Sequence, residues 1–207
     1  MRRFVIVAIC GVAALAAGCG SSSSGSNSSS GSAATTTGAS GATSSSPGAL
    51  SAEAKSTASG DIPDSQVFVT LHGSSFSMQY PEGWVQRSTA SGTTLQDKNN
   101  LVRIVVRRGT APSAAQVAQE LQRQKQTTPS LQAGTASSVT VGKTQAVKVS
   151  YTTQSAANPV TGKRVLLLVD RYVVPGTGRY AIVDLGSPKG VDNVDAYKMM
   201  IGSFRWR

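Results

Sequence analysis

The stretch Phe76-Ser77-Met78-Gln79-Tyr80-Pro81-Glu82-Gly83-Trp84 carries the most specific structural signals in this chain of 207 residues. Its first half belongs to the segment Ser75–Tyr80, which predicts a short strand bounded by turn residues. Pro81 ends that strand because proline cannot donate a hydrogen bond to a neighbouring strand. Gly83 permits the turn that follows, and Trp84 is expected to fold back over the core. These residues therefore predict a structural role rather than stacking on a ligand.

Further strand-like segments, rich in β-branched residues and separated by turn residues, lie on either side of this stretch. They are Gln66–His72, Thr93–Gln96, Leu101–Arg107, Val139–Val141, Ala146–Thr153, Arg164–Val174 and Arg179–Gly186. In Leu101–Arg107 two arginines alternate with apolar residues, which predicts a strand with one buried face. The unbroken apolar run Val165–Val169 predicts a central strand that is covered on both faces.

Two segments have the signals of helices. The first begins with a capping-box sequence, Ser113 to Gln116, and its apolar residues at helical spacing are Ala114, Val117, Ala118 and Leu121. The second is expected to start near Asp192 as its N-cap, with Val194, Tyr197 and Ile201 on one face. Ser203–Arg207 is expected to form a short strand or a packed tail. These elements predict an α+β fold, an α/β/α sandwich around a mostly antiparallel sheet.

The stretch 76–84 resembles the Tyr-Pro-x-Gly-Trp opening of the PsbP-like family. The pair of predicted strands from Asp170 to Ser187-Pro188 resembles that family's long strands before its last helix, and Ile201–Phe204 resembles its ending. The resemblance covers about Val67 to Arg207. The family includes the photosystem II extrinsic protein PsbP, a Ran-binding nuclear-import factor and actinobacterial-type lipoproteins. The resemblance implies docking to larger assemblies, although no photosystem-specific segment is present here.

The first residues are organised like a bacterial lipoprotein signal peptide, expected over 1–18. Arg2-Arg3 precede an apolar run of 14 residues, Phe4–Ala17, which is shorter than a membrane-spanning helix of roughly 20 residues. Leu15-Ala16-Ala17-Gly18-Cys19 resembles the lipobox, whose cysteine thiol receives a diacylglycerol, with Ala16 where leucine is usual. The resemblance implies a palmitate-type acyl anchor at Cys19 on the extracytoplasmic face of the cell membrane. The alternatives are an ordinary signal peptide with a chance cysteine, or a twin-arginine signal whose motif is incomplete.

A spacer and a folded domain follow the expected lipid-attachment site. Of the 41 residues from Gly20 to Gly60, 36 are Ser, Gly, Ala or Thr, so residues 19–60 are expected to form a disordered linker. Such a coil has an average reach of about 35 Å. The globular domain is expected over 61–207 and holds ten of the eleven aromatic residues. Since Cys10 lies in the leader and Cys19 would be acylated, this domain is expected to fold without a disulfide.

Candidate catalytic residues are few. His72 lies beside serines, but no Gly-x-Ser-x-Gly elbow accompanies it, and we expect an ordinary residue at a strand end. Asp170 and Asp184 fall in adjacent predicted strands and are expected to face one another or to pair with Arg171 or Arg179 in structural ion pairs. The acidic residues are too scattered for a glycosidase pair. No calcium-loop, phosphate-loop or dinucleotide fingerprint occurs, so the sequence predicts neither a metal nor another cofactor. It also predicts that the protein is not an enzyme.

Charge is the remaining signal. The domain has 17 basic and 9 acidic residues, a net charge of +8. The candidate basic surface patch consists of Arg103, Arg107, Arg108, Lys143, Lys148, Lys163 and Arg164. Anionic lipid and acidic wall polymers are its expected counterparts, since no nucleic-acid-binding module is present. The alternative is a solvated basic face that only keeps the protein soluble.

Three functional hypotheses follow from these patterns. The leading one is a membrane-anchored, non-catalytic PsbP-like domain that docks to an envelope protein or complex. The second is a binding module for a lipid, a wall precursor or another small anionic or apolar ligand, which predicts an apolar pocket of several hundred cubic ångströms. The third, a cryptic hydrolase, would need His72 or a pair of carboxylates in one cleft.

Overall fold

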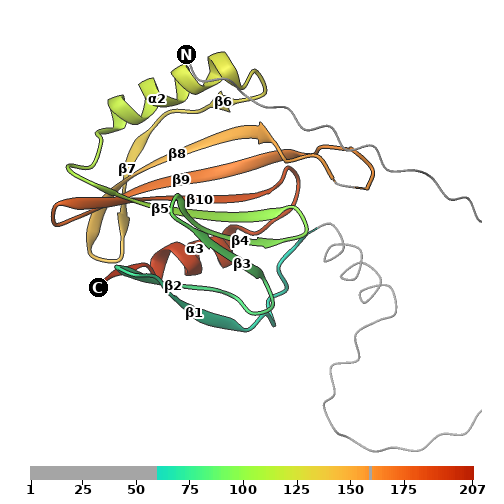
Figure 1. The fold of residues 1–207 in the computed structure, drawn as a ribbon, viewed down its shortest axis with the longest axis horizontal. Helices are drawn as coiled ribbons and strands as arrows, with labels where there is room; N and C mark the ends of the chain where they lie inside the picture. The colour runs from blue at the N-terminus through green and yellow to red at the C-terminus, as the bar shows by residue number, and fades with distance from the viewer. Residues whose placement is uncertain (1–59, 159) are drawn as a thin grey trace, which may run out of the picture. The chain divides into compact units, whose positions relative to one another are not determined.

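The computed structural model describes residues 60–158 and 160–207. The expectations for the signal peptide, for Cys19 and for the linker up to residue 59 lie outside these residues. Within the described part, two helices and two antiparallel sheets are stacked in layers (Figure 1). No helix in this part of the chain is long and apolar enough to span a membrane.

The larger sheet has eight strands in the order β3-β4-β5-β10-β9-β8-β6, and β7 pairs with the same edge of β8 as β6. Its strands are β3 (Val85–Thr89), β4 (Gly92–Asp97), β5 (Asn100–Arg108), β6 (Gln132–Ala133), β7 (Ser137–Val141), β8 (Thr144–Gln154), β9 (Leu166–Gly176) and β10 (Arg179–Pro188). The smaller sheet has the order β1-β2-β11, formed by β1 (Phe68–His72), β2 (Phe76–Pro81) and β11 (Arg205–Trp206). This arrangement is the predicted α+β fold with a mostly antiparallel sheet.

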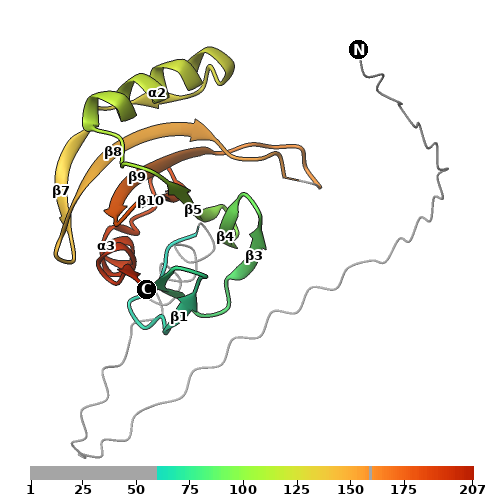
Figure 2. The same cartoon turned by 60° about the vertical axis from the view of Figure 1, so that its left-hand side comes forward.

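The two helices lie on opposite faces of the larger sheet (Figures 1 and 2). Helix α2 (Ala114–Thr127) begins with the predicted capping box, in which Ser113 Oγ accepts from Gln116 N and Gln116 Oε1 accepts from Ser113 N at 2.8 Å. Val117 and Leu121 on its inner side are buried in a cluster with residues of β8 and β9. Helix α3 (Val194–Gly202) packs between the other face and β2. Each face of the sheet therefore has its own core.

The stretch that ends β2 behaves as its residues predict. Pro81 is the last residue of β2, and Gly83 has a φ of +89°, a conformation that glycine adopts without strain. Trp84 is only 8% exposed and belongs to the core between the larger sheet, α3 and β2. The structural role predicted for these three residues is confirmed.

Several local expectations were wrong. Strand β3 was not predicted because all five of its residues are exposed, so it has no apolar alternation and forms by pairing along the edge of β4. The two-residue strand β6 was also missed. The run Val165–Val169 is not covered on both faces, since Leu166 and Leu168 are 41% and 46% exposed. Leu166 and Leu168 share the α3 face with Asp170, and α3 leaves them partly exposed.

Helix α3 starts one residue later than expected, directly after a buried asparagine. Its N-cap is Asn193 rather than Asp192, and Val194 is 56% exposed rather than buried. The Asn193 side chain is 3% exposed, accepts from Ile62 N at 2.8 Å and donates to Gly60 O at 3.1 Å. Asn100, 1% exposed, donates to the same Gly60 oxygen at 2.6 Å. These bonds fasten the beginning of the described chain to the domain.

Candidate functional site

A groove runs along the inner side of α2, where the helix leaves part of the larger sheet uncovered. Its volume is about 450 Å³, and residues from β5, α2, β9 and β10 line it. Its lining includes Arg107, Glu120, Arg123, Arg171, Tyr180 and Ile182. The floor of the groove is therefore apolar at Tyr180 and Ile182, and charged side chains lie around this apolar part.

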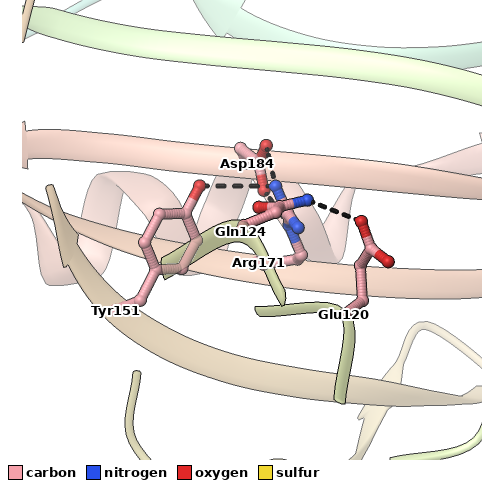
Figure 3. Close-up of polar contacts among 5 residues, drawn as sticks. All are labelled: Glu120, Gln124, Tyr151, Arg171 and Asp184. Atoms are coloured by element: carbon pink, nitrogen blue, oxygen red, sulfur yellow. Dashed lines mark hydrogen bonds and ion pairs between the residues drawn. The ribbon is translucent and has the colours of Figure 1, made fainter. Parts of the chain in front are cut away.

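The floor of the groove contains a buried ion pair (Figure 3). Arg171 Nε donates to Asp184 Oδ1 at 2.7 Å, and Arg171 Nη2 donates to Asp184 Oδ2 at 3.0 Å. The same Nη2 lies 3.4 Å from the hydroxyl of Tyr151, whose ring centroid is 5.2 Å from the guanidinium carbon. Arg171 and Asp184 are 8% and 5% exposed. Two parallel bonds of this kind hold a guanidinium in one orientation.

The register of the sheet creates this pair. Asp184 on β10 lies directly opposite Arg171 on β9, so both side chains point to the α2 face. Asp170 is opposite Leu185 and points to the other face, where it pairs with Lys148 at 2.7 Å. The expectation that Asp184 pairs with Arg171 is confirmed, and the alternative that Asp170 and Asp184 face one another is wrong.

Burial and charge shift several pKa values around the groove. Burial, followed by the charge of Asp184, raises the pKa of Tyr151 to about 12. Burial by itself would lower the pKa of Arg171, but its hydrogen bonds to Asp184 and the charge of that carboxylate outweigh burial and raise it. On α2, hydrogen bonds from Arg123 at 2.7 Å and from Gln124 at 2.9 Å lower the pKa of Glu120. All of these groups keep their ordinary charge state at neutral pH.

The raised pKa of Tyr151 predicts a loss of stability in alkali. Between pH 10 and about pH 12 the unfolded chain has lost the Tyr151 proton while the folded chain still holds it, so stability falls as pH rises. The free energy of unfolding should decrease by roughly 2 kcal/mol over this range on account of this group. Urea unfolding of wild type and Tyr151→Phe between about pH 9 and pH 12 measures the effect. Equal pH slopes in the two proteins would contradict it.

The structure brings together only some of the predicted basic residues. Arg103 and Arg107 are exposed on the α2 face of β5, and Arg108 ends that strand. Lys143 lies in the turn between β7 and β8. This turn is at the same end of the sheet as Arg108, but strands β10 and β9 lie between β5 and β8. At the opposite end, Lys163 and Arg164 lie in the loop between β8 and β9.

Lys148 belongs to a different surface. It points to the α3 face, pairs with Asp170 and lies 5.4 Å from the centroid of the Tyr172 ring. Burial would lower its pKa, but the hydrogen bond and charge of Asp170 raise it. Its charge is thus already balanced within the domain.

Sequence reasoning missed Arg87. Arg87 on β3 is opposite Thr94 on β4, and Thr94 is opposite Arg103 on β5, so the two arginines share the α2 face. Arg87, Arg103 and Arg107 are all exposed, and none of their side chains makes a hydrogen bond or ion pair with another described residue. Their alignment depends on the unpredicted strand β3, so no local signal could have revealed it.

His72 lies at the exposed end of β1. Its Nδ1 is 3.4 Å from Nη1 of Arg207, and within residues 60–158 and 160–207 no other side chain makes a hydrogen bond with it. The described residues also include no group of three or more His, Cys, Asp or Glu side chains arranged to hold a metal ion.

Solved structures show which class of fold this is. The cyanobacterial PsbP (CyanoP) of Synechocystis sp. PCC 6803 is similar with a TM-score of 0.51 and 11% identity, over 72% of this chain and 98% of that chain. A Bacteroides thetaiotaomicron VPI-5482 protein has a TM-score of 0.42 and 17% identity, over 64% and 45%. The Saccharomyces cerevisiae Ran-binding protein Mog1p has a TM-score of 0.41 and 11% identity, over 68% and 94%.

The described domain therefore has a PsbP-like α+β fold. At this level of identity the likeness to the cyanobacterial protein concerns the fold alone. No protein-family model and no curated protein matches the chain.

Proposed function

We propose that this chain is a lipid-anchored lipoprotein on the extracytoplasmic face of a cell membrane, and that its PsbP-like domain is a non-catalytic module that docks to an envelope protein. The observation that carries the docking proposal is the uncovered part of the α2 face of the larger sheet. Its exposed arginines, Arg87, Arg103 and Arg107, have no partner among the described residues. A positively charged surface of this kind suits a protein partner of opposite charge.

The anchoring part of the proposal rests on the sequence. The lipobox-like segment ending at Cys19 precedes a spacer from Gly20 to Gly60 made almost entirely of Ser, Gly, Ala and Thr. A flexible spacer lets a domain search the space near the membrane and raises its effective concentration at membrane-proximal partners. Two acyl chains are sufficient for stable anchoring.

The alternative, a module for a lipid or wall precursor, has less support. The groove beside α2 has the volume of a small-ligand site, but charged side chains form its walls. The core on the other side of the sheet is filled by large side chains such as Met78, Leu95 and Met200, which are not exposed at all. A protein surface fits these features better than an acyl chain does.

Cys19→Ser is expected to abolish acylation and to release the protein from the membrane fraction, because the thiol is the attachment point. Incorporation of labelled palmitate and fractionation of cells measure both effects. Cys10→Ser is the matched control, since Cys10 lies in the expected leader and should leave both unchanged. Palmitate incorporation into the Cys19→Ser protein would contradict the proposed anchor.

In-cell crosslinking followed by mass spectrometry tests docking. One envelope protein should be enriched with the wild type and depleted with Cys19→Ser, since release removes the high local concentration. Enrichment of a lipid or glycan without any protein would refute the docking proposal and favour the binding module.

A further inference from the structure

The groove contains an arginine that is held rigidly and still has free donors. A guanidinium has five N–H groups. Arg171 uses Nε and Nη2 for Asp184 and Tyr151, whereas Nη1 makes no hydrogen bond with another described residue. Nη1 is not among the fully buried polar atoms that lack a partner, so part of it is accessible, and Arg171 is one of the residues that line the groove. A fixed guanidinium with two free N–H groups is a prepared binding site for a carboxylate oxygen.

The charges around the groove leave a positive surplus on one side. Asp184 balances Arg171, and Glu120 on α2 accepts a hydrogen bond from Gln124 (Figure 3). Glu120 also pairs with Arg123. Arg107, which lines the groove, and Arg103, on the same face of β5 with Val105 between them, have no hydrogen-bond or ion-pair partner of this kind among the described residues. The unbalanced charge therefore lies along β5.

The spacing of these arginines suits an extended chain. Arg103 and Arg107 are four residues apart on one strand, so their backbones are about 13 Å apart. Acidic side chains four residues apart on an extended peptide have the same separation, and side chains at every second position point to one face. The apolar floor at Tyr180 and Ile182 offers contact to the stem of such a chain. A single phosphate group would reach only one of the two arginines.

We propose that the groove beside α2 and the adjoining face of β5 bind an acidic, extended segment of a partner protein. One carboxylate meets Nη1 of Arg171, and further carboxylates meet Arg107 and Arg103. This inference rests on the proposed docking function and names the surface and the chemistry of the partner.

A direct binding measurement tests the inference. The probe is a fluorescein-labelled peptide of alternating Glu and Thr, its control has Gln in place of Glu, and the protein is the full chain in detergent. The wild type is expected to bind the Glu peptide at least roughly tenfold more tightly than the Gln peptide, and added salt should weaken that binding. Equal affinity for the two peptides would overturn the inference.

Variants on the surface locate the binding site. Arg103→Gln and Arg107→Gln should each weaken binding of the Glu peptide by roughly tenfold, because each removes one charged contact. Arg164→Gln, at the opposite end of the sheet, should leave the affinity unchanged. Arg103 and Arg107 are exposed, so thermal unfolding of these variants should match the wild type. An equal loss with Arg164→Gln would refute the inference. Binding of the Cys19→Ser protein, which lacks the proposed anchor, to phosphatidylglycerol vesicles but not to the Glu peptide would also refute it.

Crosslinking in cells separates this inference from the docking proposal. If Arg103→Gln/Arg107→Gln captures the same envelope protein as efficiently as the wild type, docking is supported and the surface named here is wrong. If no envelope protein is captured although the purified chain binds the Glu peptide through these arginines, the acidic specificity is supported and the docking proposal fails.

Discussion

Asp184→Ala is expected to lower the free energy of unfolding by about 3–5 kcal/mol. The carboxylate accepts two hydrogen bonds from Arg171, at 2.7 and 3.0 Å, and both residues are more than nine-tenths buried. Its removal leaves a buried guanidinium without its counter-charge, and the Tyr151 hydroxyl at 3.4 Å is the partner that remains. Because an arginine does not lose its proton in a protein, the cost cannot be relieved by neutralisation. Urea unfolding at neutral pH measures the change.

The double variant Arg171→Met/Asp184→Leu is the matched control. Replacement of both charges by apolar side chains of similar size removes the unpaired charge and should recover most of the loss. Asp184→Asn keeps the shape and should lie between Asp184→Ala and the wild type. If Asp184→Ala lost less than about 1 kcal/mol, the typical value of a surface pair, the pair would not behave as a buried one.

Trp84→Ala is expected to have an effect of similar size, about 3–5 kcal/mol. The indole is 8% exposed and packs in the core between the larger sheet, α3 and β2, next to the turn formed at Gly83. Its removal combines the lost burial of a large apolar side chain with the cavity that the rigid core leaves behind. Denaturant unfolding monitored by far-UV circular dichroism measures the change without relying on tryptophan fluorescence.

Val85→Ala is the control for the tryptophan substitution. Val85 is the next residue along the chain and is 57% exposed on the edge strand β3, so its truncation should change stability by no more than about 0.5 kcal/mol. Equal losses in Trp84→Ala and Val85→Ala would show that the stretch matters through its turn and not through the buried indole.

Local chemistry explains which elements could be predicted. The capping box at Ser113 acts through residues three positions apart, and proline ends β2 at Pro81 itself. Such signals depend on neighbours in the chain, so they can be found without knowledge of the rest of the fold. Strand β3 has no local apolar pattern and depends on β4 for its formation, which is why it was missed.

The candidate site could be predicted only in part. Arg103 and Arg107 alternate with apolar residues, so their common exposed face followed from the period of a strand. Their position relative to Arg87 and to the groove beside α2 did not follow from the sequence. It depends on the order of the strands and on the position of the helix. Lys148 was grouped with them on charge alone, although the register turns it to the other face.

By itself the sequence determined most strands, both helices and the structural role of Trp84, because each depends on residues close together in the chain. Only the tertiary structure decided that Arg171 meets Asp184 and that Arg87, Arg103 and Arg107 share one face. These relations depend on the register between strands, and a shift by one residue would turn every side chain of a strand to the opposite face. The burial of the two faces against different helices selects that register, and burial is a property of the whole fold.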